Sequence, residues 1–265
     1  VVIKIMTPFG DDANRAGFTA PIVVVTEAAR FSDPSETSVE ADPLRQLRAR
    51  QRALSRFGQD GELSTERKFI VEGTVTTEGE LPWKIKDQST DSRILSPCPH
   101  CGEYVGPERE NLSFDTDAKT ELEAARSSFW SCPACGEEIA EPERADMVRN
   151  SILVHAGQSV TKKGKIRGKK PDTLRLFFRW SAFQNLFTTA ADIAVEEWSA
   201  VQFELGSAER ELAEKDLCQS IWAVPYTPPQ FDSVPLDRRS VSRKQDSFPL
   251  GVLPPDTEFF TVGAD

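Results

Sequence analysis

Residues 98–136 read CPHCGEYVGPERENLSFDTDAKTELEAARSSFWSCPACG, and the two ends of this segment determine how the middle of the chain folds. The first end carries Cys98 and Cys101, the second carries Cys132 and Cys135, and 30 residues separate the two C-x2-C pairs. In both pairs proline follows the first cysteine and glycine follows the second, which suits a tight turn whose backbone N–H groups face the sulfur atoms. Two such turns supply four thiolates, the closed tetrahedral shell of a structural Zn2+ site with no position left for water. The pattern predicts a zinc ribbon over residues 94–150.

Other uses of these cysteines fit the sequence less well. A pair of disulfides is typical of a secreted domain, and the chain shows no signal-peptide pattern. No apolar run approaches the roughly 18 residues of a membrane span, and the longest strongly apolar stretch is Ile22–Val25. His100 lies between two ligands, and we expect it on the solvent side rather than as a fifth ligand. Cys218 falls in a helical pattern and is predicted to be a small buried hydrophobe.

Charge limits what the chain can bind. Its 265 residues suggest about two domains, and with 32 Lys and Arg against 42 Asp and Glu the net charge is 32 − 42 = −10. This net charge excludes a protein that binds nucleic acid through a generally basic surface, but it is compatible with a local basic patch. From Glu103 to Asp146 there are four basic and twelve acidic residues, a net of 4 − 12 = −8, so the ribbon should repel phosphate. We therefore interpret the ribbon either as an element that stabilises the fold or as a site that binds another protein. Because the chain begins with Val, we expect a fragment, a processed product or an expressed segment of a longer protein.

The first 83 residues have an α/β pattern. Strands are predicted at 1–7 and 69–74, and the apolar run 22–27 is typical of a buried parallel strand. Residues 43–57 have helical spacing, with Asp42 as N-cap and Pro43 at the first helical position. Strand, helix and strand in this order indicate a βαβ unit. The arginines of the helix form either a solvated face or a phosphate-facing one.

Residues 161–170 (TKKGKIRGKK) hold six positive charges and two glycines, which predicts a flexible loop. This loop is either a solubilising disordered segment or a contact for the phosphates of DNA. The candidate DNA contacts are its basic side chains, Lys162, Lys163, Lys165, Arg167, Lys169 and Lys170.

The C-terminal part alternates between helices and an extended linker. The aromatic residues of 174–186 are expected in the core or between domains rather than as platforms for stacked bases. Residues 188–223 should form one or two helices, with Gly206 ending the first. The predicted apolar face comprises Ile193, Val195, Trp198, Val201 and Leu205. Residues 225–255 contain seven prolines and indicate a linker, and 258–265 (EFFTVGAD) reads as a strand that ends on an acid.

Catalytic residues are expected at the ends of strands. The run 22–27 is shaped like a Walker B strand, in which Glu27 would activate or orient water for ATP hydrolysis. An Asp that holds Mg2+ usually precedes this acid, but here Thr26 takes its place, a hydroxyl that adds no charge. The hydroxyls of Thr74, Thr76 and Thr77 follow the next strand and could sense the nucleotide γ-phosphate. Asp265 could ligate a catalytic metal ion.

The order of these features resembles the large subunit of phage terminase, in its lambda-like branch. The resemblance rests on VVVTEAARF, DPLRQLRAR, EGTVTTEG, CPHCGEY, CPACGEEI, EEWSAVQFELGSAERELAEKDLCQSIWAVPY and GVLPPDTEFFTVGAD. It implies an ATP-driven DNA-packaging motor with a P-loop ATPase domain and a nuclease of RNase H-like fold that uses two metal ions. Glu27 would be the catalytic carboxylate of the ATPase, Thr74, Thr76 and Thr77 its coupling segment, and Asp265 the first metal-binding Asp of the nuclease.

The resemblance also implies cofactors, partners and a location. ATP and Mg2+ would join the structural Zn2+. The partners would be DNA, the terminase small subunit and the capsid portal, with further copies of the subunit in the motor and no membrane. The site of action would be the cytoplasm of an infected bacterial cell during virion assembly.

The predicted fold class is α/β, part of a P-loop parallel sheet with a ribbon insertion, a helical segment and the start of an RNase H-like strand. The predicted division is 1–93 for the ATPase part, 94–150 for the ribbon, 151–224 for a helical segment packed on the ATPase, and 225–265 for the linker and first nuclease strand. The sequence holds no G-x-x-x-x-G-K-[ST] motif, so we expect the chain alone neither to bind ATP tightly nor to cut DNA. Two alternatives remain open at this point: a non-enzymatic zinc-ribbon interaction module, and another P-loop DNA motor with a ribbon insertion.

Overall fold

The computed structural model describes residues 18–28, 43–59 and 67–228. The chain divides into two units after Thr227, and all but one of the described residues belong to the first. The strands predicted at 1–7 and 258–265, the N-cap Asp42 and most of the proline-rich linker lie outside the described residues. No helix within the described ranges combines the length and the apolarity that crossing a bilayer requires.

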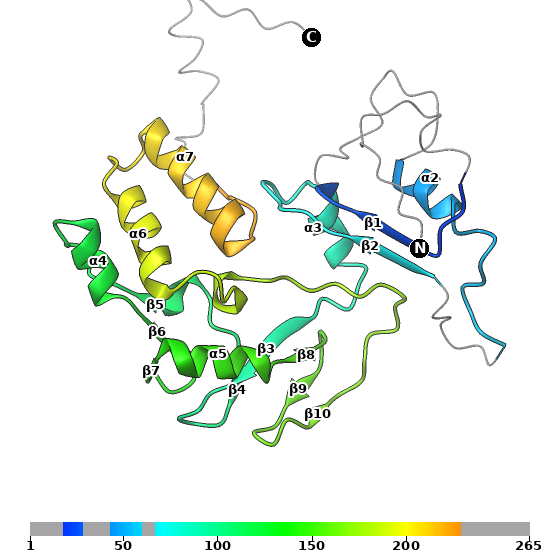
Figure 1. The fold of residues 1–265 in the computed structure, drawn as a ribbon, viewed down its shortest axis with the longest axis horizontal. Helices are drawn as coiled ribbons and strands as arrows, with labels where there is room; N and C mark the ends of the chain where they lie inside the picture. The colour runs from blue at the N-terminus through cyan, green and yellow to red at the C-terminus, as the bar shows by residue number, and fades with distance from the viewer. Residues whose placement is uncertain (1–17, 29–42, 60–66, 229–265) are drawn as a thin grey trace, which may run out of the picture. The chain divides into compact units, whose positions relative to one another are not determined.

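The N-terminal elements form the predicted βαβ unit. Strand β1 (Ile22–Val25) and strand β2 (Lys68–Val71) lie side by side in parallel, and helix α2 (Pro43–Ala49) connects them (Figure 1). Val23 and Val25 pack on Leu44 and Leu47 of the helix, and the side chains between them on β1 are exposed. The strand therefore alternates between a buried and an exposed face. The prediction of a buried parallel strand is confirmed for the parallel pairing, and the burial applies to one face of the strand.

Helix α2 is shorter than predicted and ends at Ala49 rather than Phe57. The buried side chain of Gln51 gives the reason, because its Nε2 donates to the carbonyl oxygens of Pro21 and Lys68 at 2.9 Å each. These bonds hold the chain after α2 in a turn at the amino-terminal ends of both strands. A tertiary contact thus overrides the helical spacing of the sequence.

Two small antiparallel sheets form much of the segment that is predicted to be a zinc ribbon, which is called the ribbon below. The first has the order β4-β3-β8, from Tyr104–Val105, Arg93–Pro97 and Ile152–Val154. The second has the order β5-β6-β7, from Leu112–Ser113, Phe129–Ser131 and Glu138–Ile139. The helices of this part are α3 (Leu81–Lys86), the 3-10 turn η2 (Arg109–Asn111), α4 (Glu121–Ser127) and α5 (Glu141–Arg149). Helix α4 lies between the two cysteine pairs, and the Thr120 hydroxyl caps it by accepting from the Glu123 N–H.

The basic segment is an ordered hairpin, so the prediction of a flexible loop is wrong. Strands β9 (Ser159–Val160) and β10 (Ile166–Arg167) pair antiparallel. Gly164 turns the chain with a φ of 74° and lies so close to Tyr104 that an added Cβ would come within 2.8 Å of the tyrosine Oη. The hairpin tip therefore packs against the ribbon, and this packing opposes the flexibility that glycine and like charges favour.

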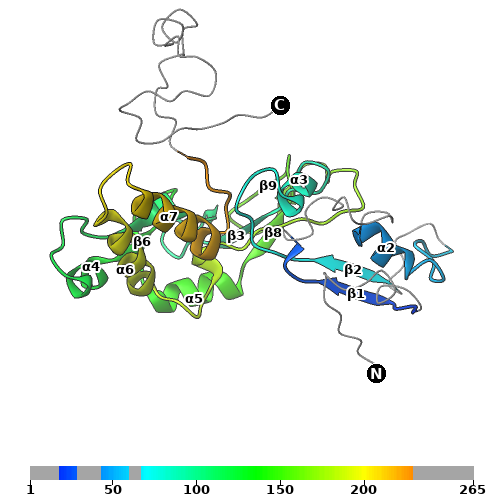
Figure 2. The ribbon, with the colours of Figure 1, turned by 90° about the horizontal axis from the view of Figure 1, so that it is seen from above.

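The C-terminal segment forms separate helices on either side of Gly206, as predicted, but the buried side of the first helix differs from the predicted one. They are the 3-10 turn η3 (Ala182–Gln184), α6 (Ala190–Val201), α7 (Ala208–Asp216) and the π-helical turn η4 (Leu217–Trp222), and Figure 2 shows α6 and α7 next to each other. Ile193 is buried as predicted, but Val201 and Leu205 are exposed. The buried face instead includes Glu197, which accepts bonds from Arg109 and Trp222. These bonds satisfy the carboxylate inside the protein and rotate the helix away from the face that hydrophobicity predicts.

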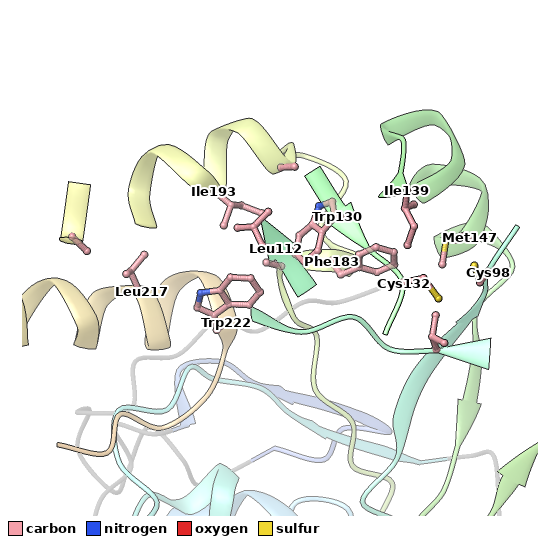
Figure 3. Close-up of a cluster of buried hydrophobic side chains, with 14 residues drawn as sticks. Cys98, Leu112, Trp130, Cys132, Ile139, Met147, Phe183, Ile193, Leu217 and Trp222 are labelled. Atoms are coloured by element: carbon pink, nitrogen blue, oxygen red, sulfur yellow. The ribbon is translucent and has the colours of Figure 1, made fainter. Parts of the chain in front are cut away.

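One hydrophobic core joins the ribbon to these helices (Figure 3). The buried Trp130 ring meets Phe183 at 5.2 Å and Trp222 at 6.0 Å in edge-on geometry. The predicted packing of the aromatic segment is right for Phe183 and wrong for Phe178 and Trp180, which are exposed.

Candidate metal centre

The two cysteine turns have the same backbone geometry. The Cys98 N–H donates to the Glu103 carbonyl at 2.9 Å, and the Gly102 N–H donates to the Cys98 carbonyl at 2.9 Å. In the second turn the Cys132 N–H donates to the Glu137 carbonyl at 2.9 Å, and the Gly136 N–H returns to the Cys132 carbonyl at 2.8 Å. Both glycines have left-handed backbones, with φ of 73° and 78°, which explains why glycine follows each second cysteine.

Four sulfur atoms converge at these turns. The Sγ atoms of Cys98, Cys101, Cys132 and Cys135 all lie within 4.8 Å of one another. Across the turns, Cys98 faces Cys135 and Cys101 faces Cys132, each with an Sγ–Sγ distance of 4.0 Å. A tetrahedral ion with metal–sulfur bonds of about 2.3 Å would place its ligands about 3.8 Å apart. The cluster is close to that size, and the cysteines are free thiols rather than disulfides, so the donor set fits a metal ion.

Burial differs within the cluster. Cys98 and Cys132 belong to the hydrophobic core, whereas Cys135 is exposed. Burial raises the pKa of the Cys98 thiol and raises that of Cys132 to about 12, whereas a backbone hydrogen bond from Glu103 lowers the pKa of Cys101. The two inner thiols are therefore neutral at pH 7 unless a cation compensates the thiolate charge.

Nearby groups enclose the cluster without joining it. His100 Nε2 lies 3.5 Å from a carboxylate oxygen of Glu143 on α5. The Lys162 ammonium donates to the Cys101 carbonyl at 2.9 Å and lies 3.3 Å from a Glu103 carboxylate oxygen. Lys162 thus ties the hairpin to the first cysteine turn, a contact that the sequence did not indicate.

The other predicted DNA contacts lie on and beyond the hairpin. Their side chains are exposed and make no ion pair with any residue in the described ranges; they are Lys163, Lys165, Arg167, Lys169 and Lys170. The structure therefore keeps these five cations available to solvent.

The predicted ATPase residues follow the carboxyl ends of the two parallel strands. Thr26 and Glu27 follow β1, and Glu27 has a left-handed φ of 52°, a strained conformation for a non-glycine residue. The Glu72 N–H donates to the Val25 carbonyl, and the Ala28 N–H donates to the Glu72 carbonyl, both at 2.9 Å. These bonds hold the two strand ends together, so the structure brings the acid and the threonine-rich segment to the same edge.

The threonine-rich segment is also tied to the C-terminal helices. The Thr74 hydroxyl accepts from Gln219 Nε2 at 3.3 Å, and the Thr76 carbonyl accepts from the Tyr226 N–H at 2.9 Å. Thr77 is exposed. Asp265, the predicted nuclease acid, lies outside the described residues.

Comparison with protein families finds a match to the ATPase domain of phage terminase large subunit gpA over residues 12–152. The chain belongs to this family. The terminase match includes both the strand ends that carry Glu27 and Thr74 and the whole four-cysteine cluster. The mixed α/β architecture, with small sheets and helices, is consistent with a terminase ATPase domain. Searches of curated proteins and of solved structures return no match.

Proposed function

We propose that this chain is the central segment of a DNA-packaging terminase large subunit, in which a zinc-bound ribbon stiffens the ATPase. The observation that carries the proposal is the family match, whose range ends only after the four-sulfur cluster. In this division residues 1–93 belong to the P-loop ATPase sheet, 94–150 to the ribbon and 151–224 to a helical segment. Residues 225–265 would lead to an RNase H-like nuclease with Asp265 as its first metal ligand.

The four cysteines would hold a structural Zn2+. When bound, the ion would supply charge compensation for four thiolates, and it would leave no coordination site open for catalysis. The protein contributes the two matched turns, which place the sulfurs, and the buried shell around Cys98 and Cys132. Since these two residues also belong to the core with Trp130 and Phe183, metal binding and packing of the helices would stabilise each other.

Glu27 would act in ATP hydrolysis by orienting or activating the attacking water. Its position after β1, at the carboxyl edge of a parallel pair, supports this role, because nucleotides bind at that edge in open α/β sheets. The strained backbone of Glu27 is a second supporting feature. The Thr26 hydroxyl would bond a water on Mg2+, and Thr74, Thr76 and Thr77 would couple the nucleotide to movement.

The hairpin cations would contact the DNA backbone. Exposure and the lack of ion pairs in the described ranges support this for the five residues beyond Lys162, since phosphate contacts need cations that are not already neutralised. Lys162 would contribute less, because it already contacts Glu103 and Cys101. Packaging would further involve the terminase small subunit, the capsid portal and other copies of the subunit, in the cytoplasm of the infected host cell.

The test is ATP hydrolysis by the complete large subunit, in the presence of DNA, with Glu27→Gln and Glu72→Gln compared. Glu72 is the matched control, because it follows the neighbouring strand and is exposed. We expect Glu27→Gln to lower kcat by at least about a hundredfold and Glu72→Gln to change it little. Equal activity of both variants would contradict the role of Glu27. The isolated chain should hydrolyse no ATP, and a turnover by the pure chain that Glu27→Gln abolishes would refute that expectation.

A second candidate function, a non-enzymatic docking module, is favoured by the net charge of −8 over residues 103–146. It predicts that the complete protein lacks DNA-stimulated ATP hydrolysis. The family match favours the terminase proposal over this alternative and over other P-loop motors.

A further inference from the structure

Residues 174–180 (LRLFFRW) run as an extended segment beside residues 90–92. The Thr90 N–H donates to the Arg175 carbonyl and the Ser92 N–H to the Phe177 carbonyl, each at 2.9 Å. Ser92 and Phe178 form a parallel bridge. One edge of the segment is therefore paired with residues 90–92, which lead into strand β3.

The odd-numbered residues of this segment face their own protein. Arg175 donates to Gln88 Oε1 at 2.5 Å, and Arg179 donates to the Trp222 carbonyl at 2.7 Å and pairs with Glu108. These contacts fix the rotation of the strand. They also occupy both arginines, so neither is available to a partner.

The even-numbered residues form an apolar row on the opposite face. Leu174, Leu176, Phe178 and Trp180 are 46%, 59%, 39% and 66% exposed. The rings of Phe178 and Trp180 pack edge to face at 5.5 Å, which holds the aromatic end of the row in place. Four apolar side chains in a row, each exposed by more than a third, form the kind of patch that marks an interaction site.

The backbone of the same residues is open. In a strand, the N–H and C=O groups of alternate residues point to opposite edges. The groups of Arg175 and Phe177 face residues 90–92, so those of the even-numbered residues point to the other edge. None of them makes a hydrogen bond within the described part of the chain. An unpaired edge beside an apolar row is a template for an added strand.

Charge specifies the chemistry of the added strand. Arg167, Lys169 and Lys170 lie a few residues before Leu174, are exposed, and have no acidic partner among the described residues. An extended partner strand would contact the apolar row and then these three cationic side chains. The best complement is a segment with alternating apolar residues that ends in carboxylates.

We propose that residues 174–180 bind an extended, acidic-ended apolar segment of a protein partner by β-strand addition. Main-chain hydrogen bonds to the open edge would provide affinity, the apolar row would select alternating side chains, and the cations would set the direction of the bound strand. This inference does not depend on ATP hydrolysis and adds a protein-binding site to the proposed function. Because Arg167, Lys169 and Lys170 are also proposed to contact DNA, the bound segment and DNA would compete for these three cations.

The test uses the whole chain and a synthetic peptide with alternating valine and threonine that ends in two glutamates. Binding is measured by calorimetry against two control peptides. One carries N-methyl groups at alternate residues, which removes the edge hydrogen bonds, and the other ends in two lysines. We expect both controls to bind at least about tenfold more weakly than the test peptide.

Matched protein variants locate the site. Leu176→Ser should weaken peptide binding about tenfold, whereas Leu205→Ser, at a residue 84% exposed on the α6–α7 turn, should leave it unchanged. Lys169→Glu should weaken binding, and Lys163→Glu at the hairpin tip should not. Equal binding of the N-methylated peptide, equal effects of the two serine variants, or no binding at all would overturn the proposal. Self-association of the chain that Leu176→Ser abolishes would also overturn it, because the row would then serve a second copy.

Discussion

Replacing the buried Arg144 by methionine should destabilise the joint between the ribbon and the C-terminal helices. The guanidinium is 1% exposed, and all five of its N–H groups are used. Nε donates to the Phe183 carbonyl at 3.0 Å, and Nη2 donates to the carbonyls of Ala182 at 3.0 Å and Asn185 at 2.6 Å. Nη1 donates to Glu141 Oε2 at 2.7 Å and to the Thr188 carbonyl at 2.8 Å. Arg144 on α5 thus donates hydrogen bonds to four backbone carbonyls of residues 182–188, the segment that leads into α6.

The magnitude follows from what methionine leaves behind. It has a similar length but no donor, so four carbonyls and Glu141 Oε2 each lose a hydrogen bond together, while Glu141 Oε1 keeps the Ala190 N–H. Losing a hydrogen bond to a charged donor costs about 1.5–3 kcal/mol, and each unsatisfied buried acceptor about 1–3 kcal/mol before relaxation. The Glu141 carboxylate adds little, because its side chain is 39% exposed and water screens its charge. We expect Arg144→Met to lower the free energy of unfolding by about 4 kcal/mol, a large share of the roughly 5–15 kcal/mol typical of a domain. Arg144→Lys keeps the charge but not the planar fork and should cost about 2–3 kcal/mol.

The assay is urea unfolding followed by tryptophan fluorescence, since Trp130 and Trp222 lie in the adjoining core. Arg149→Met is the matched control on the same helix, because Arg149 is 66% exposed and its partner in the described part of the chain is the exposed Asp146, at 2.7 Å. Its expected cost is below about 1 kcal/mol. If Arg144→Met and Arg149→Met lower the free energy of unfolding equally, the reasoning about the buried fork is wrong.

Three further predictions concern the ribbon. Cys98→Ser should remove amide protection across residues 94–150 and affect the strand around Val24 less, as measured by hydrogen exchange; uniform loss along the chain would contradict this. Zinc affinity should rise with pH, because binding must remove the Cys132 proton, whose pKa burial raises to about 12, and a chelator competition that gives a pH-independent affinity would refute it. Gly136→Ala should cost about 1–2 kcal/mol, because its φ of 78° is left-handed and nothing lies within 4 Å of the added Cβ. Gly79→Ala, at a glycine outside that region, should be close to neutral in the same unfolding assay.

The parts that the sequence predicts well are those that local chemistry determines. Each cysteine turn needs its own proline and glycine, and the printed order CPHCG and CPACG already specifies the geometry of both. The βαβ unit is also readable, because a short apolar strand, a helix with Pro43 at its start and a second strand follow at the right spacing.

The parts that the sequence predicts poorly depend on contacts between distant residues. Gln51 ends α2 by bonding two strand ends, and Tyr104 holds a glycine-rich basic segment in a hairpin. The buried face of α6 contains Glu197, whose partner Arg109 lies 88 residues away in the sequence. A hydrophobicity pattern places charged residues outside, so it could find neither Glu197 nor Arg144. The one available signal for the latter was an arginine among the acidic residues of α5.

The exposed apolar row illustrates the same limit. Aromatic density in residues 174–186 predicts burial, and Phe183 follows that rule. Trp180 does not, because the odd-numbered arginines of the strand bond to Gln88 and Glu108 and turn the even-numbered side chains outward.

The central claim is that a Zn2+ ion bound by four cysteines stabilises this terminase segment. The most direct test is to measure the metal content and the metal coordination of the chain purified without chelators. Elemental analysis combined with zinc X-ray absorption should find one Zn2+ per chain with four sulfur neighbours at about 2.3 Å. The four cysteines, whose sulfurs lie within 4.8 Å of one another, predict this result, and Cys98→Ser should lose it. A metal-free chain that retains the protection of residues 94–150, or a zinc shell with oxygen or nitrogen ligands, would contradict the account.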